Sequence, residues 1–366
     1  MTAATPWRLC LAGAGHVGAG FLAMLHDRQD ELAKRYGAAL RVCAVAEQGG
    51  GAADPAGLDL ANLIATLAAG EPLSGMPAVG RPGMTPAQMV TACAADILLG
   101  ATPVNLADGE PGLGAVRAAL RRGMHVVLAD KGPLALAYAE LAALSDLSAG
   151  WGSCYRALAG RPPRLRFSAT VAGALPIINI GRRDLAGDRI NRIEAVLNGT
   201  TQIILRAMES GLGFADALAD AQQRGIAEAD PSLDVDGYDA ACKLVITANA
   251  VLGVPATLAD VAIEGIRGLD GAEVAAHQAG GKRLVLLCTA ERTGRQYRLS
   301  VGPVPLPLDH PLARLTPDEM GVLYYTDRVN RLSGASLEPG PLPASAAMLR
   351  DVLDIVGGEV CPAARG

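Results

Sequence analysis

Residues 7–25 read WRLCLAGAGHVGAGFLAML, which is a short apolar run, three closely spaced glycines and then apolar residues at helical spacing. The pattern predicts a strand, a tight turn and a helix around a G-x-G-x-x-G motif. In such a motif Gly13 permits the turn, Gly15 lets backbone approach a pyrophosphate, and Gly18 lets the helix pack closely on the strand. The phosphate would bind the unpaired N–H groups at the helix start, beside His16 and Val17. A tight turn without a ligand is the alternative interpretation.

A second apolar stretch, LRVCAVAE (residues 40–47), ends in an acid. At the end of the second strand, Glu47 would hydrogen-bond the ribose hydroxyls of NAD and repel the 2′-phosphate of NADP. The sequence therefore favours NAD over NADP. An ordinary loop acid is the alternative.

Further short apolar stretches, ADILLG (95–100) and MHVVLA (124–129), alternate with helical patterns. This alternation predicts a parallel sheet with right-handed crossovers. Ligands of such sheets bind at the carboxyl ends of the strands, where ATPVNLADGEPG (101–112) and DKGPLALA (130–137) follow. Thr102, Pro103 and Lys131 are therefore predicted to lie near the cofactor, although taken alone Lys131 would be read as a surface lysine.

The acidic segment GIAEADPSLDVDGYDAACK spans residues 225–243 and leads into a helical pattern. Acids near a helix start complement its dipole and its free N–H groups, which accounts for part of the composition. It does not account for Asp239 and Lys243, which are four residues apart and therefore share one helix face. An ordinary i,i+4 ion pair is the alternative to a functional pair.

Composition limits the class of protein. With 366 residues, two domains are expected, and 50% hydrophobic residues supply their cores. A net charge of −5 without a basic run argues against nucleic acid or an anionic membrane as partner. The seven cysteines show no metal-ligand spacing, the pattern of the first residues predicts no secretory signal, and no apolar run has the length expected of a membrane span. A cytoplasmic protein is expected.

Five separated segments together resemble homoserine dehydrogenase: GAGHVG, ATPVNLADGEPG, DKGPLAL, VLNGTTQIIL and the acidic segment. They stand in the family's order, the resemblance covers about residues 8–355, and the pattern E-x-D-P-x-x-D-V-x-G-x-D-x-x-x-K is its most specific part. The resemblance implies NAD(P)-dependent interconversion of L-aspartate 4-semialdehyde and L-homoserine. It also implies an α/β fold, with a Rossmann-type dinucleotide-binding domain and a second α+β domain for catalysis and dimerisation.

The resemblance also assigns roles to residues. Lys131 and Lys243 match lysines of the reaction centre, and Asp239 matches the partner of Lys243. An ammonium near the aldehyde oxygen would stabilise developing negative charge and donate a proton. The carboxylates would hold the α-ammonium group of a small amino-acid substrate. The residues that match the substrate-binding positions are Glu228, Asp234, Gly199 and Thr200.

Several positions depart from the family pattern. Asp130 stands where asparagine is usual, and its carboxylate would keep Lys131 protonated. Ser168 stands where a glutamate is common in a loop that binds a monovalent cation in related enzymes, so no tightly bound metal is predicted. Gln202 and Ile203 replace an asparagine and an aromatic residue, and residues 148–163 look like an insertion. These changes suggest a divergent branch.

The domains are expected at residues 1–150 and 151–342, with a last helix at about 343–357 that packs back on the first domain. KRLVLLCTAE and QYRLSVGPV predict a hairpin with Gly294 in its turn, and Thr200 or Thr201 is expected to cap the helix that follows Gly199. The resemblance implies a homodimer, and from the length of the chain a C-terminal regulatory domain is not expected. Two alternatives stay open: an NAD-dependent reductase of another small amino-acid semialdehyde or oxo acid, and a non-catalytic nucleotide-binding relative.

Overall fold

The structure is a computed structural model that describes residues 6–149 and 162–359, and the chain divides into two compact units. Within the described residues, the first unit holds 6–149, 162–173 and 340–359, and the second holds 174–339. This division lies later than the predicted boundary after residue 150, because strand β7 (Leu165–Arg166) still pairs with the first unit's sheet. The predicted insertion at 148–163 lies almost entirely outside the described residues.

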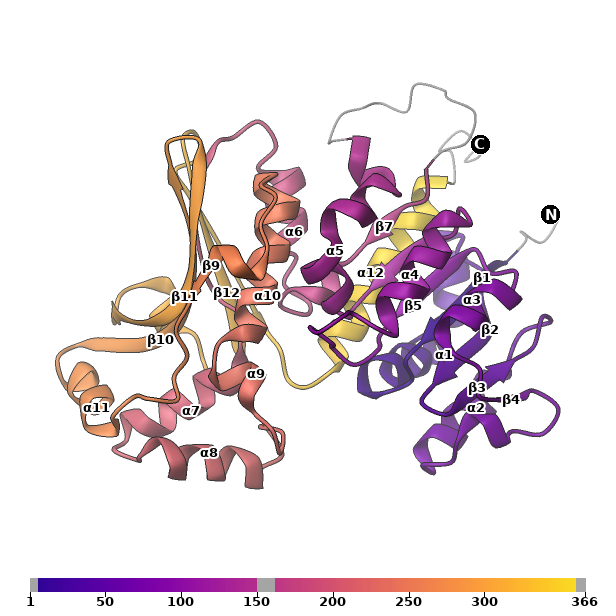
Figure 1. The fold of residues 1–366 in the computed structure, drawn as a ribbon, viewed down its shortest axis with the longest axis horizontal. Coiled ribbons are helices and arrows are strands. Elements are labelled where there is room, and N and C mark those ends of the chain that lie inside the picture. Colours follow the sequence, from indigo (N-terminus) through magenta and orange to yellow (C-terminus); the bar gives the residue numbers. More distant parts are fainter. Residues whose placement is uncertain (1–5, 150–161, 360–366) are drawn as a thin grey trace. The chain divides into compact units, whose positions relative to one another are not determined.

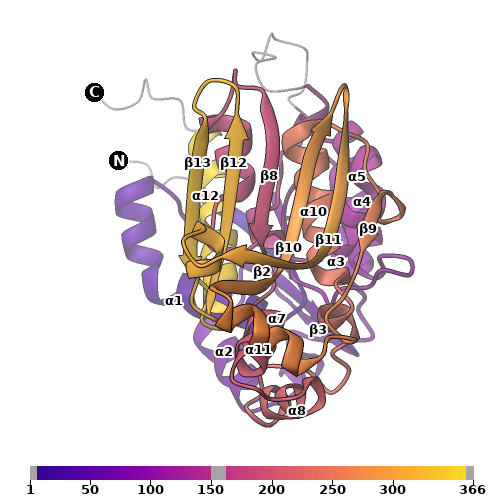
Figure 2. The same ribbon diagram turned by 90° about the vertical axis from the view of Figure 1, so that its left-hand side faces the viewer.

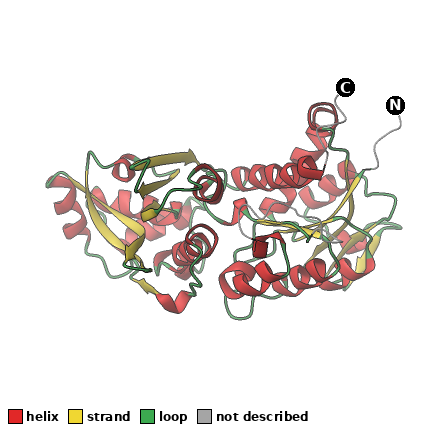
Figure 3. Ribbon diagram, turned by 90° about the horizontal axis from the view of Figure 1, so that it is seen from above, coloured by secondary structure: helices red, strands yellow, loops and turns green. Residues whose placement is uncertain are grey.

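The first unit is built on a seven-stranded sheet within the described residues, in the order β4-β3-β2-β1-β5-β6-β7. Strands β2, β1, β5, β6 and β7 run parallel, which confirms the predicted α/β architecture. Helices cover both faces of this sheet (Figure 3). Besides β7, the strands of this sheet are β1 (Trp7–Ala12), β2 (Leu40–Glu47), β3 (Gly50–Ala53), β4 (Gly80–Pro82), β5 (Ile97–Gly100) and β6 (His125–Leu128). The helices are α1 (His16–Tyr36), α2 (Leu60–Ala68), α3 (Pro86–Ala92), α4 (Gly112–Arg121), α5 (Gly132–Ala143) and α12 (Leu342–Glu359), with short turns η1 (Leu73–Gly75), η2 (Asp146–Ala149) and η3 (Ser168–Thr170).

The central strands consist mainly of apolar residues because they are buried on both faces. All four residues of β5 are buried, and so are the last four of β1. At the other edge of the sheet, β3 and β4 run antiparallel to their neighbours. The sequence did not predict these two strands, since they are short and rich in glycine.

Helix α12 completes the core of the first unit (Figure 1). Its residues Met348, Val352 and Ile355 are buried in the same cluster as Leu9 of β1 and Phe21 of α1. The hydroxyl of Ser345 donates to the carbonyl oxygen of Val17 at 2.8 Å. The last helix therefore belongs to the unit that begins the chain.

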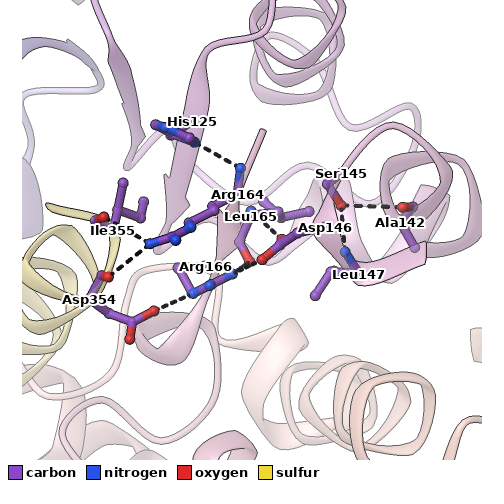
Figure 4. A network of polar contacts seen from close by, with 10 residues as sticks. All are labelled: His125, Ala142, Ser145, Asp146, Leu147, Arg164, Leu165, Arg166, Asp354 and Ile355. Atoms are coloured by element: carbon purple, nitrogen blue, oxygen red, sulfur yellow. Dashed lines mark hydrogen bonds and ion pairs between the residues drawn. The ribbon is translucent and has the colours of Figure 1, made fainter. Parts of the chain in front are cut away.

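A polar network also joins α12 to the sheet's last strand (Figure 4). The guanidinium of Arg166 lies 2.7 Å from a carboxylate oxygen of Asp146 and 2.6 Å from one of Asp354. The side chain of Arg164 donates to the carbonyl of Ile355 at 2.9 Å, in the last turns of that helix. The network ties β7 to α12 and to η2, the turn that follows α5.

The second unit is an α+β structure with a six-stranded sheet within the described residues, in the order β13-β12-β8-β10-β11-β9 (Figure 2). Its strands are β8 (Ile190–Val196), β9 (Val261–Ile263), β10 (Lys282–Thr293), β11 (Gln296–Pro307), β12 (Glu319–Thr326) and β13 (Arg331–Leu337). Its α-helices are α6 (Ile177–Asn179), α7 (Gly199–Glu209), α8 (Phe214–Gln223), α9 (Ser232–Val235), α10 (Tyr238–Thr247) and α11 (Gly271–Ala279). Shorter helical segments are η4 (Ile180–Asp184), η5 (Ala248–Leu252), η6 (Leu258–Asp260) and η7 (Pro311–Arg314).

The predicted hairpin is confirmed: β10 and β11 pair antiparallel along their whole length, and Gly294 has a φ of +67° in the turn. The strand β8 lies at the centre of this sheet and runs directly into α7. Within the described residues, no helix has the length and apolar character that crossing a membrane requires.

Candidate active site

The glycine loop of the first unit connects β1 to α1. Gly13 has a φ of +95°, and a β-carbon there would lie 2.3 Å from the carbonyl oxygen of Ala101. A β-carbon at Gly18 would lie 2.1 Å from the carbonyl oxygen of Gly13. Both positions therefore require glycine, one because the loop after β5 approaches closely and the other because α1 packs against the turn.

Gly15 differs from these two glycines because a β-carbon there would meet nothing within 4 Å. Gly15 is exposed and is the N-cap of α1, and it has no side chain that could accept from the first N–H groups of the helix. His16 beside it is also exposed, whereas Val17 is half-buried. A cavity of about 510 Å³ opens between this end of α1 and α2. Open space at a helix N-terminus fits the phosphate groups of a dinucleotide.

Glu47 lies at the carboxyl end of β2, half-buried. One of its carboxylate oxygens accepts the backbone N–H of Leu73 at 2.7 Å. This bond anchors a negative charge at the same edge of the sheet as the glycine loop, because β1 and β2 are parallel.

The segments after β5 and β6 reach this edge as well, since both strands run parallel to β1. Thr102 is buried, Pro103 is exposed, and Lys131 is half-buried at the start of α5. The carboxylate of Asp130 accepts the hydroxyl of Thr102 at 2.6 Å and the N–H of Gly132 at 2.9 Å. Burial raises the pKa of Asp130. The structure thus groups every predicted cofactor-binding residue along one edge of the sheet.

The second unit buries a lysine. Lys243 is only 8% exposed, and its ammonium nitrogen lies 2.8 Å from a carboxylate oxygen of Asp239. It also donates to the carbonyl oxygen of Leu197 at 2.6 Å. The pair is four residues apart on α10, as the sequence predicted, but burial distinguishes it from an ordinary surface ion pair.

Asn198 links this pair to a second carboxylate. Its side-chain amide nitrogen donates to Asp234 at 2.6 Å and to Asp239 at 2.9 Å. Its carbonyl oxygen accepts the backbone N–H of Thr201 at 2.8 Å and caps α7. Asn198 and not a threonine is therefore the cap, so that prediction was wrong. Sequence reasoning missed Asn198, although an asparagine between a strand and a helix is a recognisable capping signal.

The electrostatics of this cluster leave one negative charge in excess, since two carboxylates face one ammonium group. Burial raises the pKa of Asp234, and the neighbouring charge of Asp239 raises it further. Hydrogen bonds from Asn198 and from the hydroxyl of Thr200 act in the opposite direction. The cluster is suited to bind a cation beside Asp234.

The other predicted substrate residues are placed differently. Gly199 and Thr200 follow Asn198 in the first turn of α7 and are half-buried. Glu228 is exposed, before α9, and the structure shows its backbone carbonyl accepting from Gln222 at 3.0 Å. Asp230 accepts from the N–H and hydroxyl of Ser232 at the start of α9, which is a local turn contact.

Ser168, where the sequence departs from the family pattern, is buried in the first unit. Its N–H and its hydroxyl each donate to the carboxylate of Asp351 at 2.7 Å. Within the described parts of the chain, no group of three or more histidine, cysteine, aspartate or glutamate residues could hold a metal ion.

Comparisons with known proteins agree with this geometry. A family model described as "Homoserine dehydrogenase" matches residues 176–353. The chain is 32% identical to a homoserine dehydrogenase of Methanocaldococcus jannaschii over 348 residues, 95% of this chain and 98% of the relative. It is also 32% identical to an NAD(+)-dependent homoserine dehydrogenase of Pseudomonas canavaninivorans over 353 residues, 96% of each chain.

Solved structures share the fold. The putative homoserine dehydrogenase of Archaeoglobus fulgidus is 28% identical with a TM-score of 0.81, over 96% of this chain and 99% of that one. A hyperthermophilic archaeal homoserine dehydrogenase in complex with NADPH is 23% identical with a TM-score of 0.80, over 96% of this chain and 97% of that one.

Proposed function

The chain belongs to the homoserine dehydrogenase family, and we propose that it interconverts L-aspartate 4-semialdehyde and L-homoserine with a nicotinamide cofactor. The observation that carries the proposal is the cluster of the buried Lys243 with the half-buried Asp239 and Asp234, in a chain that also holds an open glycine loop. Burying a charged group costs free energy, so an ion pair of no more than local structural use would be expected on an exposed helix face.

The glycine loop is the part of the chain that would hold the cofactor. When bound, the nicotinamide supplies or accepts the hydride. The free N–H groups at the start of α1 would bind the pyrophosphate, and Gly15 leaves room for it. Thr102 and Pro103 would line the same edge, and Lys131 would lie towards the nicotinamide end.

Lys243 is the proposed proton donor to the aldehyde oxygen. Its two observed partners, the carboxylate of Asp239 and the carbonyl of Leu197, accept hydrogen bonds and fix the direction of the side chain. An ammonium group has three donors, so one remains for the substrate oxygen. In the reverse direction, the neutral amine would accept the hydroxyl proton of homoserine.

The excess negative charge of the cluster selects the substrate. Asp234 would bind the α-ammonium group of homoserine, and its ionised form is required for this contact. Glu228, Gly199 and Thr200 are proposed to complete the substrate site. A substrate without a cationic group would leave the half-buried charge of Asp234 beside that of Asp239 without compensation.

For the cofactor, we propose a preference for NAD over NADP. The support is the anchored carboxylate of Glu47 at the end of β2, which would accept ribose hydroxyls and repel a 2′-phosphate. One relative is named NAD(+)-dependent, whereas another homologous structure holds NADPH, so the preference differs among such proteins.

A second candidate function changes only the substrate. Gln202 lies on α7, four residues after Asn198, and is 1% exposed. Its side-chain oxygen has no hydrogen-bond partner in the described part of the chain. Its amide nitrogen donates to the carbonyl of Glu319. This buried acceptor without a partner is a change in the segment that follows Asn198, and a changed segment there would suit another small amino-acid semialdehyde as substrate.

The test is an assay of the purified protein with L-homoserine and each oxidised nicotinamide, followed by amino alcohols one carbon longer. Lys243→Met keeps the side-chain volume and should lower kcat by at least about a hundredfold. NADH affinity should remain unchanged, since Lys243 belongs to the second unit. Lys282→Met, an exposed lysine on β10, is the matched control. If Lys243→Met turns over homoserine as fast as the wild type, the role assigned to Lys243 is refuted. A higher kcat/KM for a longer substrate than for homoserine would favour the second candidate.

We also propose a homodimer that forms through the sheet of the second unit, as the family resemblance implies. Leu337 on β13, an edge strand of that sheet, is 58% exposed and would be available to such an interface. Sedimentation velocity should show a dimer, and Leu337→Glu should shift it towards monomer. A wild-type monomer at micromolar concentration would refute the proposal.

A cytoplasmic location is proposed from the thiols. Among the described residues, Cys10, Cys43 and Cys288 are buried free thiols, and Cys93 is a half-buried one. Free thiols persist in a reducing compartment. Cell fractionation with an activity assay checks the location.

A further inference from the structure

We propose that Asn198 is a positioning residue of the substrate site, whose amide group holds Asp234 and Asp239 as two separate carboxylates so that Asp234 stays available for the substrate's ammonium group. The inference rests on the proposed function for its biological meaning. The contacts that carry it are observed whatever the substrate is, and all of them lie within the second unit.

The orientation of the Asn198 amide is fixed by its partners. The backbone N–H of Thr201 can only donate, so the atom 2.8 Å from it must be the side-chain oxygen of Asn198. The NH₂ group then faces the two acids, with 2.6 Å to Asp234 and 2.9 Å to Asp239. Both of its hydrogens are used, and the residue is only 4% exposed. Each hydrogen bond to an ionised carboxylate is stronger than one between neutral groups.

The two acids need a donor between them. Two carboxylates that lie close together in a buried site share a proton unless something stabilises both charges. Lys243 contacts Asp239, but the structure gives no ion pair between Lys243 and Asp234 among the described residues. Without the amide of Asn198, Asp234 would keep its proton to a higher pH and lose its attraction for an ammonium group.

The surroundings of Asp234 contain few other charges. The groups that affect its pKa are the carboxylate of Asp239 and the ammonium of Lys243 on α10, and Asn198 and Thr200 at the start of α7. From β10, the thiol of Cys288 faces the same lysine and aspartate, but burial raises its pKa to about 12 and keeps it neutral. Asn198 therefore provides the donor that contacts both acids at once.

The local chain path explains why this position can do so. Asn198 is the N-cap of α7, with extended backbone angles, two residues after the end of β8. Leu197 just before it offers its carbonyl to Lys243. The junction between β8 and α7 thus places one donor and one acceptor against the start of α10.

Substitution by serine separates the two roles of Asn198. Serine is as good a helix cap as asparagine, so Asn198→Ser should preserve the start of α7. Its single hydroxyl cannot donate to both carboxylates. Asn198→Ala removes both roles. Asp270→Ala, which removes the cap of α11 in the same unit, is the control for a loss of capping alone.

The measurement is the pH profile of kcat/KM for L-homoserine, whose acid limb reports groups of the free enzyme. In Asn198→Ser the acid limb should move up by about one pH unit, the size expected for losing a hydrogen bond to a charged group. At pH values below this limb, the decrease in kcat/KM should come mainly from a higher KM for L-homoserine, with NADH affinity unchanged. Asp270→Ala should keep the wild-type profile. If the profile of Asn198→Ser superimposes on that of the wild type, Asn198 is only a cap and the inference is overturned.

A second readout does not depend on turnover. In protein with ¹³C-labelled aspartate carboxyl groups, the resonance of Asp234 is assigned by its loss in Asp234→Asn. Its titration midpoint should rise by about one unit in Asn198→Ser. If the wild type fails to oxidise homoserine but this shift occurs, the proposed function fails and the positioning role of Asn198 stands. An unchanged midpoint overturns the role whether or not the enzyme is active.

Discussion

Replacing Asp351 with asparagine should stabilise the first unit, and increasingly so as the pH rises. Asp351 is 2% exposed on α12, where burial raises its pKa from 3.8 to about 6 despite the two hydrogen bonds from Ser168. The folded state therefore binds more protons than the unfolded state between those values. Stability must fall as the pH rises through this window and then remain at the lower value.

The magnitude follows from the size of the shift. About two pKa units correspond to about 3 kcal/mol of stability lost between low and neutral pH. Asparagine has the same shape, and its side-chain oxygen can accept the N–H of Ser168 while its amide donates to the hydroxyl oxygen. Asp351→Asn should therefore equal the wild type near pH 4 and exceed it by about 3 kcal/mol near pH 7.5.

Urea unfolding followed by tryptophan fluorescence measures this difference. Trp7 on β1 lies beside His125 in the first unit, and a Trp151→Phe background leaves it as the sole tryptophan of the chain. Asp354→Asn on the same helix is the control, because the Asp354 side chain is 60% exposed and its ion pair should contribute at most about 1 kcal/mol. A stability difference between Asp351→Asn and wild type that is the same at both pH values would refute the reasoning.

Three further predictions concern the first unit. Glu47→Ala should lower the ratio of kcat/KM with NAD to that with NADP by about tenfold, since it removes the charge that repels a 2′-phosphate; steady-state kinetics with both cofactors measure the ratio, and a constant ratio contradicts the role. Gly15→Ala should change the free energy of unfolding by less than about 1 kcal/mol yet weaken NADH binding, measured by fluorescence titration. Gly18→Ala should lower the free energy of unfolding by about 2 kcal/mol, because its β-carbon meets the carbonyl of Gly13. Equal losses of stability in the two variants would contradict the assignment of open space to Gly15. Lys131→Met should reduce kcat more than NADH affinity, and unchanged kcat would place Lys131 outside the reaction.

The sequence predicted the features that arise from local geometry. The glycine spacing, the apolar strands and the helical repeat after residue 237 each reflect contacts within a few residues, so they can be recognised without the fold. For the same reason the i,i+4 pair of Asp239 and Lys243 was visible in the sequence. Its burial was not, because burial depends on what packs around a helix.

The tertiary structure alone revealed the contacts between distant residues. Asn198 meets Asp234 and Asp239 across 36 and 41 residues, and Ser168 meets Asp351 across 183. The identity of a polar residue does not determine its partner, since any donor can satisfy a buried carboxylate. Which donor does so depends on how β8, α7 and α10 pack, and this packing is determined by the whole apolar core and not by any short stretch of sequence.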